Sequence, residues 1–251
     1  MKEQNTRVLA IDLGASSGRV MMARLEDGAV SLQEIHRFSN DPVPVGKTFY
    51  WDILRLFHEI RTGLQKAKTF GPFESLSVDT WGVDFGLLDR DGNLLSNPVH
   101  YRDARTAGMC AQMEKMISPE RLYEITGNQI MEINTLFQLL AVRQNQPDSI
   151  RSDVSMLMIP DLLHYMLTGK KAAELSIAST SQMLNMKKKT WSEELARLLD
   201  LPEEFLPRIV ESGTVIGTLA EEICTEFSLP PVKVIASAGH DTQCAMAATP
   251  A

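Results

Sequence analysis

Cysteine is scarce in this chain, and the spacing of the few cysteines excludes the sites that they usually form. The 251 residues contain three, Cys110, Cys224 and Cys244. This odd number at wide separations fits neither the paired spacing of a zinc site nor a disulfide framework. The polar N-terminus runs directly into a short apolar stretch, residues 8–13, without the apolar length and cleavage site of a signal peptide. We therefore expect a cytoplasmic protein.

Positive charge and long apolar runs are lacking as well. The formal net charge is -7, and no run of Lys or Arg is longer than residues 187–189. A nucleic-acid-binding protein normally carries a basic patch, and a membrane-spanning helix needs about 20 mostly apolar residues. The sequence shows neither feature. We therefore expect no nucleic-acid or membrane partner and favour a small soluble substrate.

Two familiar nucleotide-binding signatures are missing. Residues 46–48 (Gly-Lys-Thr) resemble the end of a P-loop, but Asp41 stands where the first glycine should be. Pro42 and Pro44 also break the geometry of such a loop. No GxGxxG occurs, which removes the dinucleotide fingerprint and the main argument for a dehydrogenase.

The residues that are present predict an antiparallel meander near the N-terminus. Strand-like runs cover residues 8–12, 18–25 and 30–38, and the dipeptide Asp27-Gly28 is a strong hairpin signal. Asp52 is predicted to cap a helix that packs on this meander. The helix shows apolar residues at intervals of three and four, as on one face of an α-helix: Ile53, Leu56, Phe57, Ile60 and Leu64.

The remaining elements indicate the fold class. Residues 76–79, 83–88 and 232–238 are predicted as strands, and residues 106–201 as mostly helical. Five residues are predicted to start or end helices in that region: Ser118, Asn134 and Ser192 as starts, and Gly127 and Gly169 as ends. This order of elements is typical of a ribonuclease-H-like α/β domain, the unit that actin-like ATPases and sugar kinases duplicate. We expect a mixed five-stranded sheet with a helical insertion.

A loop rich in glycine and serine joins the first two predicted strands. Residues 14–18 bring two glycines and two serines between Asp12 and Arg19. Backbone N–H groups and hydroxyls in such a loop can approach a phosphate closely. Asp12 offers oxygen ligands suited to Mg²⁺, and Arg19 offers a planar cation for a phosphate. The alternative is a plain hairpin turn in which Asp12 and Arg19 pair with each other.

The segment at residues 79–84 follows a buried strand and mixes acids, a hydroxyl, an aromatic ring and a glycine. Such a mixture suits the polar and apolar faces of a sugar. Gly82 would let the backbone touch a ligand, and Trp81 would lie against it. The alternative is a turn in which Trp81 only fills the core.

A second set of candidates ends the last predicted strand, where open α/β sheets bind their ligands. Asp241 is the candidate general base, because an ionised carboxylate can accept the proton of an attacking hydroxyl. His240 would orient the substrate, beside Thr242. The alternative makes Asp241 the N-cap of the following helix and His240 a hydrogen-bonded edge residue.

For two further groups of residues, the sequence favours a structural role over a functional one. The charged cluster at residues 101–105 (Tyr-Arg-Asp-Ala-Arg) favours a solvated ion-pair face over a brace for the sugar pocket. Five methionines are predicted to pack in the core: Met156, Met158, Met166, Met183 and Met186.

Several of these segments, taken together, carry a resemblance. The chain is similar to the rhamnulokinase group of the FGGY carbohydrate kinases in the residues at 12–21, 34–38, 79–85, 101–106 and 240–242. The first segment is shared by many sugar kinases. The DTWGVDF, YRD and HDT segments separate this group from glycerol and xylulose kinases.

The resemblance implies a reaction and a set of roles. The reaction is transfer of the γ-phosphoryl group of ATP to the 1-hydroxyl of L-rhamnulose, with Mg²⁺ placed by Asp12. Gly82 and residues 240–242 would contact the ketose, and Asp241 would accept the proton. The implied ATP-phosphate contacts are Ala15, Ser16, Ser17, Gly18 and Arg19.

The resemblance covers nearly the whole chain and implies that residues 1–251 are the N-terminal, sugar-binding domain, with the C-terminal ATP-binding domain absent. We therefore expect this chain to be inactive by itself. Two alternatives stay open: a kinase for another ketose, such as L-fuculose or xylulose, and a noncatalytic sugar-sensing module with the actin-like fold.

Overall fold

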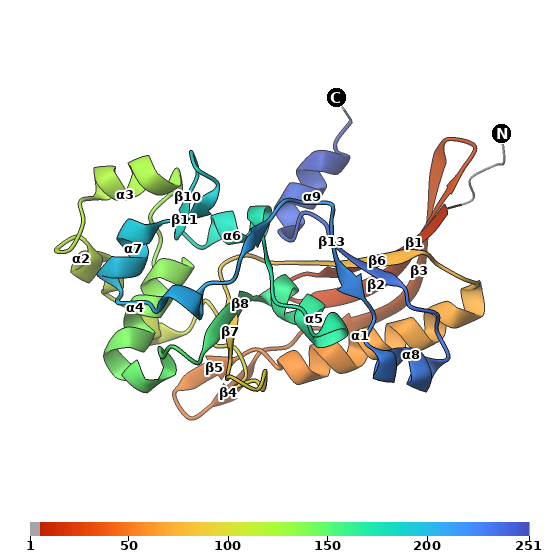
Figure 1. Ribbon diagram of the computed structural model, residues 1–251, viewed down its shortest axis with the longest axis horizontal. Helices are drawn as coiled ribbons and strands as arrows, with labels where there is room; N and C mark the ends of the chain where they lie inside the picture. The colour runs from red at the N-terminus through yellow and green to blue at the C-terminus, as the bar shows by residue number, and fades with distance from the viewer. Residues whose placement is uncertain (1–5, 251) are drawn as a thin grey trace.

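The protein is built around one mixed β-sheet, with several helices against one face, the last helix on the opposite side and a largely helical insertion at one end (Figure 1). The computed structural model describes residues 6–250. The sheet has six strands in the order β13-β14-β6-β1-β2-β3. Their bounds are Thr6–Leu13 for β1, Ser17–Glu26 for β2, Ala29–Ser39 for β3, Ser75–Thr80 for β6, Thr214–Thr218 for β13 and Lys233–Ala236 for β14.

The predicted meander is confirmed. Strand β2 pairs antiparallel with both β1 and β3. At the β2–β3 turn, Asp27 and Gly28 have φ angles of 49° and 78°, the positive values that a tight type I′ hairpin requires. The neighbouring strand β6 runs parallel to β1, so that Asp12 lies beside Asp79. Strand β14 also runs parallel to β6.

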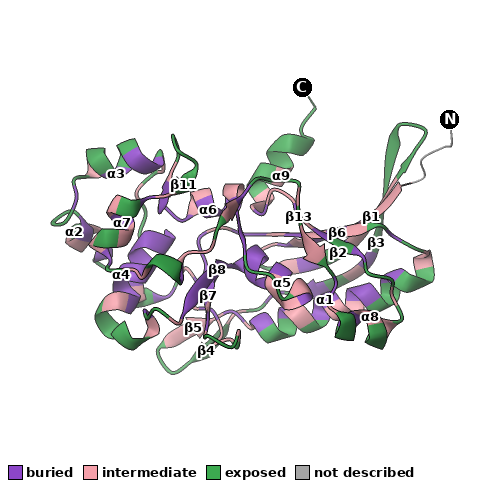
Figure 2. Cartoon of the chain, viewed as in Figure 1, coloured by how far each residue is buried: buried purple, intermediate pink, exposed green. Residues whose placement is uncertain are grey.

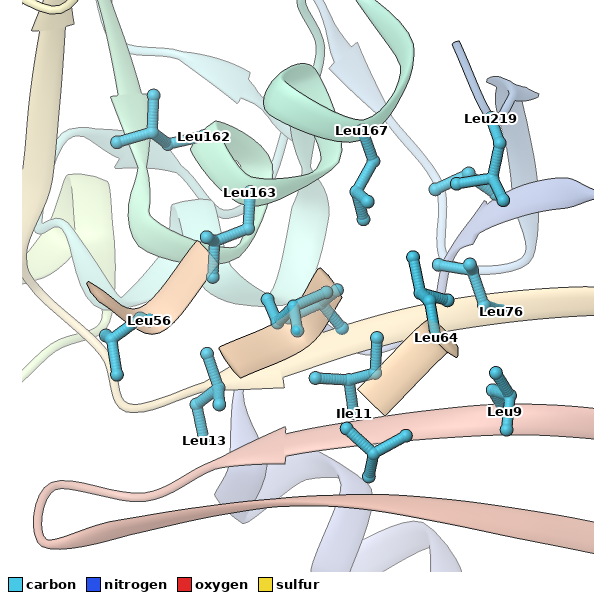
Figure 3. Close-up of a cluster of buried hydrophobic side chains, with 14 of the residues drawn as sticks. Leu9, Ile11, Leu13, Leu56, Leu64, Leu76, Leu162, Leu163, Leu167 and Leu219 are labelled. Carbon is cyan, nitrogen blue, oxygen red and sulfur yellow. The ribbon is translucent and has the colours of Figure 1, made fainter. Parts of the chain in front are cut away.

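Helices α1 (Ile53–Ala67) and α5 (Ile159–Thr168) cover one face of the sheet and enclose the main core. The predicted helix is confirmed, and the Asp52 carboxylate accepts a hydrogen bond of 3.1 Å from the Arg55 amide. Figure 3 shows side chains of β1 and α1 meeting those of α5. The labelled leucines and isoleucine of this cluster are almost fully buried: Leu9, Ile11, Leu13, Leu56, Leu64, Leu76, Leu162, Leu163, Leu167 and Leu219.

The insertion has its own hydrophobic core around α4 (Thr135–Asn145), where Figure 2 shows a second concentration of buried residues. The other helices are α2 (Met109–Met113), α3 (Pro119–Thr126), α6 (Leu175–Thr180), α7 (Glu193–Leu198), α8 (Glu221–Phe227) and α9 (Asp241–Ala248). The short strands are β4 (Val43–Val45), β5 (Thr48–Tyr50), β7 (Phe85–Leu88), β8 (Ser155–Met158), β9 (Ala173–Glu174), β10 (Leu184–Asn185), β11 (Thr190–Trp191) and β12 (Ile209–Val210). Short 3-10 helices are η1 (Lys68–Phe70), η2 (Ala104–Thr106), η3 (Pro147–Ser149) and η4 (Glu203–Phe205).

The sheet differs from the prediction in two respects. The sheet has six strands instead of five, because β13 adds to one edge. Strand β13 was missed because its sequence, TVIGT, lacks a regular alternation of apolar and polar residues, and its Val215 is 52% exposed. The strand predicted at residues 83–88 begins at Phe85, since Val83 has a φ of 68°, and it pairs with β8 outside the main sheet.

Most of the predicted helix ends are confirmed. Ser118 and Ser192 accept hydrogen bonds from amides in the first turns of α3 and α7, and Gly127 and Gly169 end α3 and α5 with positive φ. Asn134 precedes α4, but its side chain makes no cap bond. The methionine prediction holds for the buried Met156, Met158 and Met183 and for the partly buried Met166, which packs against the core, but Met186 is 44% exposed.

One buried carboxylate connects the sheet side of the molecule with the insertion. Asp84 is 1% exposed. It accepts hydrogen bonds from the indole N–H groups of Trp51 (2.5 Å) and Trp81 (3.0 Å) and from the Gln138 amide on α4 (2.9 Å). Burial raises the pKa of Asp84 to about 6, although these hydrogen bonds favour its charged form.

We expect Asp84→Ala to lower the free energy of unfolding by about 3 kcal/mol or more, because it leaves several buried donors without an acceptor at about 1–3 kcal/mol each. Asp84→Asn, which keeps one acceptor oxygen, should cost less. Urea denaturation of the two variants measures this, with the exposed Asp91→Ala as control. An Asp84→Ala variant as stable as the control would show that the network contributes nothing.

Candidate active site

A pocket of about 450 Å³ lies where the sheet meets the insertion. The sheet side provides the turn after β6 and the start of α9, and the insertion provides the α3–α4 segment and the C-terminal end of α6. The lining residues on the sheet side are Trp81, Gly82, Val83, Tyr101, His240 and Gln243. Those on the insertion side are Asn128, Gln129, Met131, Ile133, Asn134, Ser179 and Thr180. Three predicted sugar contacts, Trp81, Gly82 and His240, therefore come together.

The other two predicted contacts begin α9, directly after His240. The strand end is held beside β6 by a hydrogen bond of 2.9 Å from the Thr80 amide to the Gly239 carbonyl. Asp241 is the first residue of α9, and the N-cap position belongs to His240, so the alternative of Asp241 as the N-cap is wrong. Its Oδ1 accepts from the Thr242 amide at 2.6 Å. Burial lowers the pKa of His240, opposed by the charges of Asp241 and Glu174.

Trp81 contributes more to the core than to the pocket. It is 6% exposed, and its ring packs on Trp51 with the centroids 4.0 Å apart. The core-filling alternative is thus largely correct, although Trp81 still contributes to the pocket wall. At Gly82, an added Cβ would lie 3.0 Å from Thr180 Cβ, so any larger residue there would press on α6 and require Thr180 to shift.

The loop between β1 and β2 is a short hairpin at the same edge of the sheet. Asn40 braces it by donating from Nδ2 to the Gly14 carbonyl at 2.8 Å. Ala15 and Ser16 are exposed, and among the described residues their amides donate to no backbone oxygen. Gly18, in contrast, is buried and packs closely under the Phe38 ring. An added Cβ there would lie 2.4 Å from that ring, so the position requires a glycine. The Ala15 and Ser16 amides therefore have no backbone acceptor among the described residues, and contact with ATP phosphates stays a prediction.

Asp12 and Arg19 pair with each other, as the hairpin alternative expects. Arg19 Nε and Nη2 both lie 2.8 Å from Asp12 Oδ2. The side chains are 32% and 47% exposed, so this pair is a partly screened surface interaction that incoming phosphate could rearrange. The pairing does not exclude a role of either side chain in phosphate or metal binding.

Three carboxylates act on one another at this edge of the sheet. Burial, and after it the charges of Asp12 and Asp241, raise the pKa of Asp79 to about 7, whereas the charge of Arg19 opposes the shift. Among residues 6–250, no group of three or more acidic, His or Cys side chains is arranged to hold a metal. Mg²⁺ is commonly bound through one or two carboxylates together with substrate phosphates. Asp12, with Asp79 beside it on β6, fits that mode.

Several residues of the candidate site were missed in the sequence. Glu174, fully buried, accepts a hydrogen bond of 2.9 Å from the Gly239 amide, but glutamate is not a typical N-cap residue and carries no sequence signal for this role. Asn128 and Gln129 follow the helix end at Gly127, and that polar pair could have indicated a ligand-binding loop. Asp79 was predicted only as part of its segment.

The prediction of a solvated ion-pair face at residues 101–105 is wrong. Asp103 is 9% exposed and accepts a hydrogen bond of 2.8 Å from the Phe49 amide. Arg105 donates to the Gln138 side chain at 2.6 Å, and Tyr101 lines the pocket. Asp103 and the Arg105 Nη2 group thus have partners inside the fold, although Arg105 Nε has none among the described residues and Arg102 is exposed. The segment therefore braces the pocket wall.

Comparison with known proteins identifies similar sequences. Residues 7–248 match the protein family described as "FGGY family of carbohydrate kinases, N-terminal domain". A rhamnulokinase of Bacteroides thetaiotaomicron is 44% identical over 96% of this chain and 50% of its own length. A rhamnulokinase of Enterococcus faecalis is 41% identical over 96% of this chain and 49% of its own length. The chain thus spans about half the length of the curated relatives that it matches.

Solved structures share the fold. A ligand-bound xylulose kinase from Lactobacillus acidophilus superposes with a TM-score of 0.82 at 19% identity, over 93% of this chain and 48% of that one. Plasmodium falciparum glycerol kinase with ADP gives a TM-score of 0.82 at 16% identity, over 96% and 49%. At such identities the likeness concerns the fold alone. Within the part of the chain that the structure describes, no helix is long and apolar enough to cross a membrane.

We expect Asp79→Asn to stabilise the protein more at pH 8 than at pH 5. The pKa of Asp79 rises from 3.8 to about 7 on folding, so the stability that this group contributes falls as the pH rises between these two values. The asparagine variant lacks this dependence. Urea denaturation at both pH values measures the difference, with Asp91→Asn as control. An equal effect at both pH values would contradict the raised pKa.

Proposed function

Since the chain belongs to the FGGY family of carbohydrate kinases, we propose that it forms the sugar-binding half of an ATP-dependent kinase that converts L-rhamnulose to L-rhamnulose 1-phosphate. The rhamnulokinases that resemble it at 41–44% identity support this substrate. The three cysteines, all free, fit the cytoplasmic location that we propose for it.

The observation that carries the proposal is the mixed chemistry of the pocket beside Asp241. L-Rhamnulose is a deoxyketose with hydroxyl groups along most of its length and a methyl group at carbon 6. The insertion wall offers apolar Met131 and Ile133, and the pocket also contains the amide side chains of Gln129 and Gln243. We assign the apolar pair to the methyl end and the amides to the hydroxyl groups.

Asp241 is the proposed general base, and the chemistry takes place at the start of α9. Its carboxylate would take the proton from the 1-hydroxyl as that oxygen forms its bond to the γ-phosphorus of ATP and the bond to the bridging oxygen of ADP breaks. His240 and Thr242 on either side would hold the ketose hydroxyls. A His240 side chain kept neutral by burial can both donate and accept hydrogen bonds, which suits this role.

The β1–β2 loop is the proposed phosphate site. The amides of Ala15 and Ser16, the hydroxyls of Ser16 and Ser17 and the guanidinium of Arg19 would contact ATP phosphates. Gly18 would serve by letting the loop close against Phe38. Asp12 would hold Mg²⁺, which supplies neutralising charge to the phosphates when bound.

A second half of similar size would supply the adenosine pocket, because the rhamnulokinase relatives are about twice as long as this chain. Phosphoryl transfer needs the donor held in line with the acceptor and water excluded by closure. We therefore propose that residues 1–251 alone bind ketose weakly and do not catalyse transfer.

Asp241→Asn, made in the two-domain protein, should lower kcat by about 10²–10⁴ while ketose and ATP affinities stay near those of the parent, since only the proton acceptor is lost. Coupled ADP-release kinetics and calorimetry measure the two effects. Asp148→Asn, at an exposed position, is the matched control. Turnover within a few-fold of the parent would remove Asp241 from the chemistry.

The 251-residue chain should bind L-rhamnulose more tightly than L-fructose, which differs only by a hydroxyl on carbon 6, and should release no ADP from millimolar ATP with Mg²⁺ and either sugar. Burying that hydroxyl against Met131 without a partner costs free energy. Met131→Gln should reduce the preference for L-rhamnulose over L-fructose.

Tighter binding of L-fuculose or xylulose would favour a different ketose kinase, and binding without turnover in the two-domain protein would favour a sugar-sensing module. Ketose-dependent ADP release by the 251-residue chain that disappears in Asp241→Asn would contradict the proposal that a second half must supply the adenosine pocket.

A further inference from the structure

Glu174 is a buried acid whose carboxylate accepts more hydrogen bonds than a helix cap requires. It is 0% exposed and lies directly before α6. As an N-cap it accepts from the amides of Ser176 (2.9 Å) and Ile177 (3.0 Å). The same carboxylate also accepts from the Gly239 amide at 2.9 Å and from the hydroxyls of Ser176 and Ser212.

These bonds connect three segments that are distant in sequence. Gly239 precedes the proposed base by two residues, and Ser212 lies in the turn before β13. In addition, the His240 amide lies 3.5 Å from the Ser176 hydroxyl, which itself donates to Glu174. The turn that carries His240 and Asp241 is therefore attached to the N-terminal end of α6, and Figure 1 shows α6 beside the start of α9.

The other end of the same short helix is attached to the sugar-contacting turn. Thr180, the last residue of α6, accepts a hydrogen bond of 3.0 Å from the Val83 amide through its hydroxyl. Its side chain also lies against the Cα of Gly82. One rigid six-residue helix thus spans the distance between Gly239 at one end and the Gly82–Val83 turn at the other.

We propose that Glu174 is a positioning residue, which fixes Asp241 relative to the ketose by tying the Gly239 turn to α6. This inference rests on the proposed function, because it takes Asp241 as the base and Gly82 as a sugar contact. The reach of a glutamate is the specific requirement: an aspartate could cap α6 equally well but is one methylene too short to hold the Gly239 amide at the same time. A misplacement of about 1 Å in such a site can cost about 10²-fold in rate.

The decisive variant is Glu174→Asp, because it keeps the charge and a preferred N-cap side chain and should fold. In the two-domain protein we expect kcat to fall by about tenfold to 10²-fold, with the ketose dissociation constant and the KM for ATP within about threefold of the parent. Glu174→Gln, the second variant, keeps the reach and one oxygen that can accept from the Gly239 amide, so its kcat should fall less than that of Glu174→Asp. Ser212→Ala removes another donor to the same carboxylate without touching Gly239, and its turnover should stay near that of the parent.

Amide hydrogen exchange in the 251-residue chain separates this inference from the proposed function. Exchange of the Gly239 amide should become faster in Glu174→Asp, while the Ile177 amide in α6 stays protected, since the cap is retained. If Glu174→Asp turns over as fast as the parent, or if Gly239 keeps its protection, the positioning role is wrong and Glu174 is only a cap. A third outcome is that the two-domain parent phosphorylates no ketose, while the Gly239 amide still exchanges faster in Glu174→Asp. In that case the hydrogen bond between Gly239 and Glu174 is confirmed and the proposed function is wrong.

Discussion

The parallel pairing of β6 with both β1 and β14 is the constraint on which the candidate site depends. Parallel strands point their carboxyl ends to one edge of a sheet, and in an open α/β sheet that edge is where ligands bind. Here it gathers Asp12, Asp79 and the turn at residues 239–241, which lie far apart in sequence. A different strand order would leave the same residues in separate places.

Bringing Asp12, Asp79 and Asp241 to one edge of the sheet places three carboxylates near one another, which is electrostatically unfavourable. Burial, together with the charges of Asp12 and Asp241, raises the pKa of Asp79 to about 7, and Arg19 opposes this shift. A cation with its phosphates would relieve this repulsion, and strained charge of this kind is common where a protein binds charged ligands.

The insertion completes the pocket through buried polar contacts. Asp84 joins two tryptophans to α4, and Glu174 joins α6 to the strand end at Gly239. Both carboxylates are nearly inaccessible to solvent and satisfied by several N–H donors. Hydrogen bonds of this kind are directional, so they hold two separately packed cores in one relative position more specifically than apolar contacts do.

Local signals in the sequence were sufficient for the meander, the Asp27-Gly28 turn, the helix after Asp52 and most caps, because each depends on neighbours in the chain. The order of elements and the motifs at residues 12–19, 79–84 and 239–242 together indicated the fold class, and the motifs indicated the edge of the sheet where the candidate site lies. Only the tertiary structure decided which groups surround Glu174, Asp79 and Asp103. Their environments are made by residues that are distant in sequence, and burial and hydrogen-bond partners, which set the chemistry of an acid, exist only once the chain has folded.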